Sequence, residues 1–317
     1  MSKTATELTE SQHRFHGRSD CKSPDISDEV KSSAKQKGLD LRYVTNSLRW
    51  VVYGTPVGRA LMIVPRVMRA VRTSGQPLLY ILPWAVASRE HTNFSYQTTD
   101  ASRVGLCGMV AVIADTDIQT VSAYAEELQS NAELAEHVRA VHADSERKWT
   151  SDAKFRPGRN TLHYLLVRAL KSGFVVEAGV DKGLGAAIIC EALRRNAAEG
   201  HTGDYLGIEY NPIQRSSIYA RFPHKRGEIR HGNLPDVIRT IDRKIDLFLH
   251  DTTTEPVHVR AQLEALQGHM APRGVIAVPW PLPQFAEYAA KNDKRLLMHK
   301  DEPVRHWYPG SRSMVLF

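Results

Sequence analysis

The sequence has 317 residues, of which 42% are hydrophobic and 24% are charged, values that fit one large globular domain or a core domain with a smaller one. Its three cysteines are widely spaced and form no CxxC or Cys/His cluster, which argues against a disulfide scaffold or a structural zinc site and favours a reducing compartment. The first residues lack the apolar segment of a signal peptide, and no apolar run approaches the roughly 20 residues that span a bilayer. We therefore expect a cytoplasmic protein.

The first part of the chain divides into two regions. Residues 1–40 are polar and show no apolar period, so we predict a disordered or loosely attached tail. From residue 41 the composition changes, and we predict a mainly helical N-terminal region over 41–160.

The net charge of +7 is concentrated in this helical region. Residues 41–110 contain eight arginines, no lysine and two acids, Glu90 and Asp100. Arginine suits the recognition of carboxylates, phosphates or an anionic surface. Four of these arginines would share one face of a helix, which Pro56 and Pro65 would break into short pieces. We expect a basic amphipathic helix packed on its own domain, with docking to an anionic lipid surface as the alternative; the four arginines are Arg59, Arg66, Arg69 and Arg72.

Two further helices are predicted before the second half of the chain. Residues 117–149 are rich in Ala, Glu and Leu, which predicts one helix capped by Asp115 or Asp117. Residues 161–173 form the second predicted helix, which Gly173 would end.

From Phe174 onward, apolar strands alternate with helical segments. Such alternation predicts an α/β fold with a Rossmann-like, mostly parallel sheet and helices on both faces. No helical segment separates the last two strands, so a closing hairpin would make the final strand antiparallel. The seven predicted strands are 174–180, 204–210, 227–233, 245–251, 274–280, 295–300 and 311–317.

The stretch EAGVDKGLG (177–185) joins the first of these strands to an alanine-rich helix. A phosphate-binding loop would need GxxxxGK[ST], which is absent. The glycine spacing also fits short-chain NAD(P) dehydrogenases, which require a downstream YxxxK pair; YAAK (288–291) is one residue short of it. An NAD(P) oxidoreductase stays open as an alternative.

This stretch, with three later motifs, resembles class I S-adenosylmethionine (SAM)-dependent methyltransferases, in particular small bacterial O-methyltransferases. Their first motif, [ED]xGxxxGxG, matches residues 177–185. The resemblance implies that Glu177 favours the cationic end of SAM, that the glycines let the backbone approach the ligand, and that the following helix presents its N-terminus. It also implies a SAM-binding core over 161–317, with 41–160 as an acceptor-binding or cap region.

The later motifs follow in the family's order. Glu209, at the end of the second strand, is in the place of the acid that takes the ribose hydroxyls, and a vicinal diol matches two carboxylate oxygens. Asn233 replaces the acid that contacts the adenine amine, and Asp251 ends the fourth strand near the methyl group. The resemblance thus implies a cofactor site formed by Glu177, Ala178, Gly179, Gly183, Gly185, Glu209, Gly232, Asn233, Leu234 and Asp251.

Methyl transfer from a sulfonium requires positioning, exclusion of water and, for a hydroxyl nucleophile, a base. The candidate catalytic residues are His250, Asp251 and Glu255. No [DNS]PP[FYW] motif follows the fourth strand, which disfavours amino-methylating nucleic-acid enzymes. The fifth strand ends VPWPLPQ with no Asp-Asp or Asp-Asn pair, so we expect no metal, and Glu255 leaves a metal site open as the alternative.

These observations predict a metal-independent O-methyltransferase that acts on a hydroxyl or carboxylate of a small, anionic acceptor in specialised metabolism. We expect a small-molecule acceptor and no nucleic-acid partner, and we leave open peripheral contact with an anionic surface and assembly into a homo-oligomer. The alternative from another class is a catalytically silent SAM-fold protein that binds RNA or an anionic membrane through residues 41–110.

Overall fold

The computed structural model describes residues 56, 60, 63–88, 96–144, 154–211 and 217–317. The predicted tail, residues 1–40, lies outside the described residues. The chain divides into two units, Met1–Arg72 and Thr73–Phe317, and the sheet, the helices from α5 onward and the candidate site all belong to the second.

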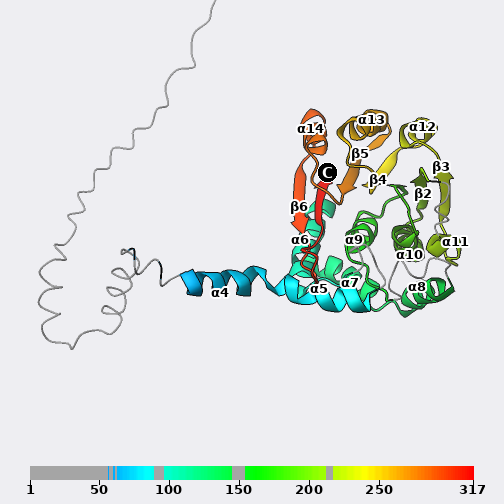
Figure 1. Ribbon diagram of the computed structural model, residues 1–317. Coiled ribbons are helices and arrows are strands. Elements are labelled where there is room, and N and C mark those ends of the chain that lie inside the picture. The colour runs from blue at the N-terminus through cyan, green and yellow to red at the C-terminus, as the bar shows by residue number, and fades with distance from the viewer. Residues whose placement is uncertain (1–55, 57–59, 61–62, 89–95, 145–153, 212–216) are drawn as a thin grey trace, which may run out of the picture. The chain divides into compact units, whose positions relative to one another are not determined.

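The second unit is built on a seven-stranded sheet with the order β3-β2-β1-β4-β5-β7-β6 (Figure 1). Strands β1 to β5 are parallel to one another, whereas β7 is antiparallel to both β5 and β6. The α/β class, the mostly parallel sheet and the antiparallel last strand are therefore confirmed. The strands are β1 (Phe174–Ala178), β2 (Asp204–Glu209), β3 (Gly227–His231), β4 (Ile245–His250), β5 (Met270–Val278), β6 (Leu296–Lys300) and β7 (Arg312–Leu316).

Helices cover both faces of this sheet, because alternate strand residues point to opposite sides. Val175 belongs to one hydrophobic cluster, and its neighbour Val176 belongs to the other. The first cluster packs α6 (Asp100–Ala114), α7 (Ile118–Gln129), α8 (Ala132–Asp144), α9 (Asn160–Leu170), α10 (Leu184–Ala198) and α11 (Ser217–Ala220). The second packs α12 (Leu234–Arg239), α13 (Pro256–Leu266) and α14 (Pro283–Lys291). Two more helices precede these, α4 (Ile63–Ser74) and α5 (Gln76–Ala87).

The helical segment predicted over 117–149 differs from the structure. Its described part forms two helices, α7 and α8, that are separated at Asn131. The Asn131 side chain accepts a hydrogen bond from the Leu134 amide at 2.9 Å and donates one to Glu191 at 2.9 Å. This capping geometry competes with a continuous helix. Asp117 caps α7, as one of the two predicted alternatives, through a 2.8 Å bond from the Thr120 amide.

Other boundaries are also corrected. Helix α9 ends at Leu170, because Lys171 adopts the left-handed conformation (φ 50°), so Gly173 is not its terminator. Helix α6 is absent from the predicted elements. No helix in the described part of the chain is long and apolar enough to cross a membrane.

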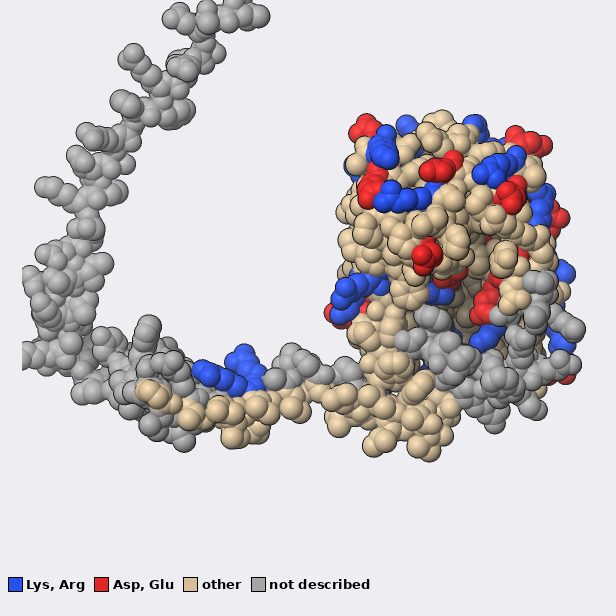
Figure 2. Space-filling view, turned by 45° about the horizontal axis from the view of Figure 1, so that its top comes forward, with Lys and Arg blue, Asp and Glu red and all other residues tan. Residues whose placement is uncertain are grey.

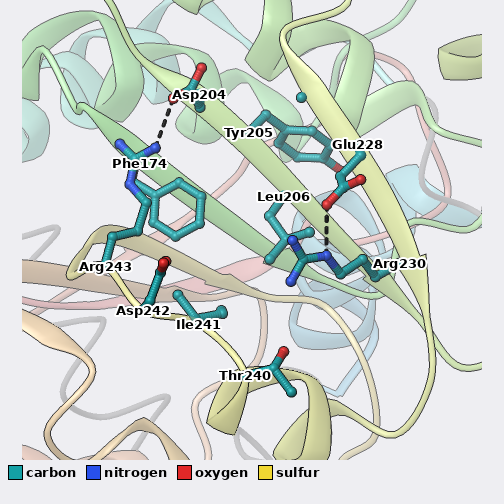
Figure 3. Close-up of a pocket in the computed structure, with 11 residues that line it drawn as sticks. Phe174, Asp204, Tyr205, Leu206, Glu228, Arg230, Thr240, Ile241, Asp242 and Arg243 are labelled. Carbon is teal, nitrogen blue, oxygen red and sulfur yellow. Dashed lines mark hydrogen bonds and ion pairs between the residues drawn. The ribbon is translucent and has the colours of Figure 1, made fainter.

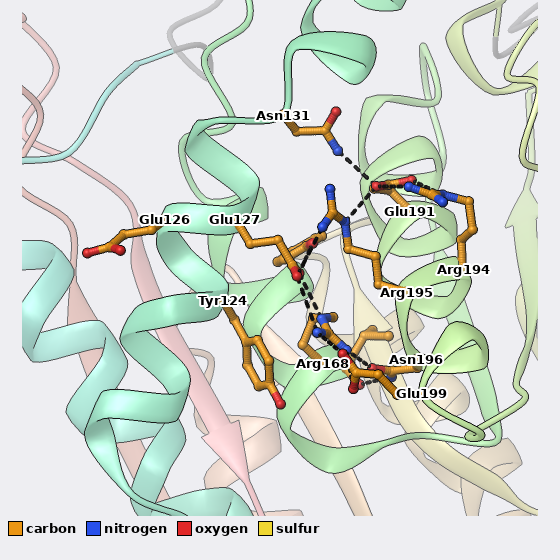
Figure 4. A network of polar contacts seen from close by, with 12 residues as sticks. Tyr124, Glu126, Glu127, Asn131, Arg168, Glu191, Arg194, Arg195, Asn196 and Glu199 are labelled. Atoms are coloured by element: carbon orange, nitrogen blue, oxygen red, sulfur yellow. Dashed lines mark hydrogen bonds and ion pairs between the residues drawn. The ribbon is translucent and has the colours of Figure 1, made fainter.

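A buried polar network ties α7, α9 and α10 together (Figure 4). The Arg168 side chain is 1% exposed and donates to Glu127 at 2.8 Å and to Glu199 at 2.6 Å. Its guanidinium also lies over the Tyr124 ring, 4.2 Å from the centroid. Because a buried charge is stable only when it is paired and hydrogen-bonded, this arginine fixes α9 against the two helices beside it.

We predict that Arg168→Met destabilises the protein by about 2–4 kcal/mol, because the buried Asn196 amide loses its donor and the partly buried Glu127 loses its cation. The free energy of unfolding, measured with urea, checks this. Arg239→Met is the matched control, since Arg239 makes one ion pair with Asp236 in which both side chains are more than half exposed; we expect a loss below about 1 kcal/mol. Equal losses for the two variants would contradict the network's role.

Candidate functional site

The glycine loop after β1 is held against the loop after β4. The Asp251 amide donates to the Ala178 carbonyl at 2.8 Å. Gly179 has φ +87°, and a Cβ on it would lie 2.1 Å from the Asp251 carbonyl oxygen. Neither the conformation nor the distance accepts a side chain. Gly183, also with positive φ, begins α10, so the loop passes from β1 into the helix as the sequence predicts.

A cavity of about 550 Å³ opens at the carboxyl ends of β1, β2 and β3. This is the edge where parallel α/β sheets bind their ligands. The structure brings six of the predicted cofactor residues to its lining, whereas Glu177, Gly183, Gly185 and Asp251 are not part of that lining. The six are Ala178, Gly179, Glu209, Gly232, Asn233 and Leu234.

Glu209 is tied to the glycine loop. Its Oε2 accepts from the amides of Val180 and Asp181, both at 3.0 Å, and its Oε1 accepts from the Asn211 amide at 2.8 Å. A carboxylate has about four lone-pair sites, so Oε1 keeps room for one more donor. To accept hydrogen bonds from two ribose hydroxyls, as predicted, Glu209 would have to give up one of these three backbone hydrogen bonds. The structure also shows that Glu209 holds the glycine loop in place.

Asn233 lies on the cavity wall at the N-cap of α12. Its Nδ2 donates to the Asp236 carboxylate at 3.1 Å. Because a carboxylate only accepts, this bond fixes the orientation of the amide and leaves Oδ1 as an acceptor. The arrangement suits the predicted contact with an adenine amine.

Glu177 lies beneath the glycine loop and is 2% exposed. Its Oε2 accepts from the Tyr205 hydroxyl at 2.5 Å, and a Cβ on Gly185 would lie 2.3 Å from its Oε1. Burial raises the pKa of this carboxyl to about 8, which the Tyr205 hydrogen bond only partly opposes. At neutral pH the group is therefore mostly protonated, and a cation brought close to it would favour loss of that proton.

Asp251 pairs with a residue that sequence reasoning missed. Its Oδ2 lies 2.5 Å from the guanidinium of Arg159, with both side chains less than a fifth exposed. Burial raises the pKa of Asp251, and the charge of Arg159 opposes that shift. The same guanidinium lies over the ring of Trp280, 5.8 Å from its centroid. Residues from the start of α9 and the ends of β4 and β5 thus form one charged cluster.

The other two candidate bases lie in different surroundings. His250 is 1% exposed, bonds Gln262 Oε1 at 2.8 Å and packs edge-on against Phe285. Burial lowers the pKa of His250, so the ring is neutral. Glu255 is exposed at the N-cap of α13. Neither residue lines the cavity, and their catalytic roles stay predictions.

A second cavity of about 500 Å³ lies at the amino ends of β1, β2 and β3 (Figure 3). It is lined by Phe174, Asp204 and Gly227, the first residues of β1, β2 and β3, and none of the predicted site residues reaches it. Arg243 pairs there with Asp204 at 2.7 Å and lies over the Phe174 ring. The cavity at the carboxyl ends therefore remains the candidate site, because it is the one of the two that the predicted cofactor residues line.

Comparison with known protein families identifies the domain that contains this site. Residues 176–278, from β1 through β5, match the family model described as a methyltransferase domain. These residues form a methyltransferase domain. The chain thus contains a SAM-dependent methyltransferase domain, with SAM as the cofactor, and the oxidoreductase alternative is not supported.

Similar solved structures include three O-methyltransferases. The enzyme TomG from Streptomyces achromogenes, of tomaymycin synthesis, is 16% identical, with 59% of this chain and 90% of that chain covered and a TM-score of 0.45. A putative O-methyltransferase from Klebsiella pneumoniae is 13% identical, with 63% of this chain and 96% of that chain covered and a TM-score of 0.46. An O-methyltransferase from Bacillus cereus is 16% identical, with 62% of this chain and 96% of that chain covered and a TM-score of 0.44. No curated protein matches the sequence.

The residues predicted to bind the cofactor suit SAM in their chemistry. The cavity holds a carboxylate with one acceptor site left on Glu209 and the amide oxygen of Asn233, and the Gly179 backbone lines it without a side chain. Among the described residues, no group of three or more His, Cys, Asp or Glu side chains is placed to hold a metal ion.

We predict that stability depends on pH through Glu177. In the unfolded chain its carboxyl ionises near the ordinary value of 4.5, whereas in the folded chain its pKa is about 8. Stability from this group is fully present below the lower value and is lost as the pH rises toward the higher one, by up to about 1.4 kcal/mol per pH unit.

Urea unfolding of Glu177→Gln and the parent protein at pH 5 and pH 8, without SAM, measures this effect. We expect the variant to gain stability relative to the parent between these pH values, because an amide cannot ionise. A difference between the two proteins that stays constant with pH would contradict the raised pKa.

Proposed function

We propose that the protein transfers the methyl group of SAM, without a metal ion, to an oxygen of a small, anionic acceptor in the cytoplasm, as a step of specialised metabolism. The observation that carries this proposal is the pair of Asp251 and Arg159 at the end of β4. A carboxylate that accepts protons and a fixed guanidinium lie together there, largely shielded from water and next to the loop that borders the cofactor cavity.

The chain's residues divide the work of the reaction. When bound, SAM supplies an electrophilic methyl group. Glu209, Asn233 and the glycine loop would hold it at the carboxyl ends of β1 to β3. Asp251 would accept the proton of a hydroxyl acceptor, since burial raises its proton affinity. Arg159 holds the Asp251 carboxylate in place and favours an acceptor with negative charge, and Trp280 covers the guanidinium.

The Arg159 guanidinium also supports a reaction without metal. The guanidinium forms an ion pair with the Asp251 carboxylate. A metal-dependent enzyme would need that carboxylate as a metal ligand. The nearest further carboxylate in the same loop is the exposed Glu255.

The proposed function is tested by incubating the full chain with SAM and a panel of small phenols, hydroxy acids and carboxylic acids, each beside its uncharged ester or ether. Mass spectrometry identifies the methylated atom, and released S-adenosylhomocysteine gives the rate. We expect O-methylated products, faster turnover of the anionic members, and rates that EDTA does not change. Transfer to nitrogen alone, or activity that EDTA abolishes and Mg²⁺ restores, would contradict the proposal.

We predict that Asp251→Asn separates the two acceptor classes. A hydroxyl acceptor needs a base, and removal of one costs roughly 10²–10⁴-fold in kcat. A carboxylate acceptor is already ionised, so its kcat should fall by less than about tenfold. The carboxylate reaction thus reports whether the variant is folded, and Glu264→Gln, at an exposed position on α13, serves as the control that changes neither rate. Equal losses for both acceptors would assign Asp251 a structural role.

A further inference from the structure

Helix α5 exposes one apolar face. Leu78, Leu79, Leu82 and Val86 follow the i, i+1, i+4, i+8 spacing of a single helix face and are 64–87% exposed. The opposite face carries Trp84, whose ring centroid lies 5.0 Å from that of Trp307. The helix is therefore held on the domain by one side, while its larger aliphatic side chains point to water.

Helix α4, taken by itself, is amphipathic. Ile63, Val64, Val67, Met68 and Val71 are 55–67% exposed and share one face by the same spacing. Arg66 and Arg69 fall on the other face. Exposed apolar groups of this size mark an interaction site.

The charge of residues 63–88 limits which partner can bind the apolar faces of α4 and α5. Residues 63–88 contain arginines and neither an acid nor a lysine, and Figure 2 shows the described side chains of α4 and α5 with blue but no red. A symmetric contact with a second copy would bring the arginine-bearing helix against itself without an acid to neutralise it. An anionic lipid surface supplies both the negative charge and an apolar layer.

The length of the helices determines how they would meet a membrane. Each has 12 residues, which span about 18 Å at 1.5 Å per residue, well short of the roughly 30 Å hydrocarbon core. A short helix with an apolar face and arginines on its polar face lies in the headgroup region, parallel to the surface.

We propose that α4 and α5 dock the enzyme peripherally on a membrane containing anionic lipids. The apolar face of each helix enters the acyl boundary, and Arg66 and Arg69 bind lipid phosphates. This docking is independent of the acceptor and of the O-methylation proposed above.

The test is co-sedimentation of the full chain with vesicles of phosphatidylcholine alone or mixed equally with phosphatidylglycerol, in low and in high salt. We expect binding to the mixed vesicles that high salt weakens. Arg66→Ala with Arg69→Ala should weaken it by roughly tenfold or more, at about 1 kcal/mol per arginine. Leu79→Glu with Leu82→Glu should remove it, because buried leucines become charges.

Val112→Glu is the matched control, since Val112 on α6 is 58% exposed and lies outside both helices; its binding should equal that of the parent. SAM binding, measured by calorimetry, shows whether each variant is folded. If the Leu79→Glu, Leu82→Glu variant does not fold, the Arg66→Ala, Arg69→Ala variant still tests the proposal, because both arginines are exposed. Equal binding to neutral vesicles, no effect of the arginine pair, or preference for RNA would overturn the proposal. So would a lipid-free dimer, seen by analytical ultracentrifugation, that Leu79→Glu with Leu82→Glu dissociates, because that result assigns the face to a second copy.

Discussion

The candidate site depends on one close approach of two backbones. At Gly179 the chain leaves β1 with positive φ and passes so near the Asp251 carbonyl that a single added carbon would overlap it. This contact joins the loops after β1 and β4, neighbouring strands of the sheet. It places the candidate cofactor cavity and the Asp251–Arg159 pair next to the same loop.

Three ionisable side chains contact this part of the structure from different sides. Glu177 lies under the loop and keeps its proton to about pH 8 because it is buried. Glu209 binds the loop amides from the side. Arg159 reaches Asp251 from the start of α9, the helix that Arg168 fixes against α7 and α10. The helical layer before the sheet thus contributes to the site by holding α9.

The sequence predicted the parts of this arrangement that are local. Strands such as β1 and β4 are apolar runs bounded by glycines or polar residues, and the order of Glu177, Glu209, Asn233 and Asp251 predicts a cofactor site at the carboxyl ends of the strands. The pairing of Arg159 with Asp251 was not predictable, because the two residues are 92 positions apart and no spacing links them. The break at Asn131 depends on Glu191, 60 residues away. Helix α6 was missed because its apolar residues run nearly without interruption, a pattern that does not separate helix from strand.

The account's central claim is that the glycine loop at Gly179 forms the SAM site, and calorimetry of S-adenosylhomocysteine binding to Gly179→Ala tests it most directly. Gly200→Ala is the matched control, because Gly200 has φ +90° but a Cβ added to it would meet nothing within 4 Å, so both variants carry the same backbone strain of about 1–2 kcal/mol and only one carries the clash. In samples that unfold cooperatively on heating, we expect binding to be lost in Gly179→Ala and unchanged in Gly200→Ala. Parent-like affinity in Gly179→Ala, or equal losses in both variants, would contradict the placement of the site.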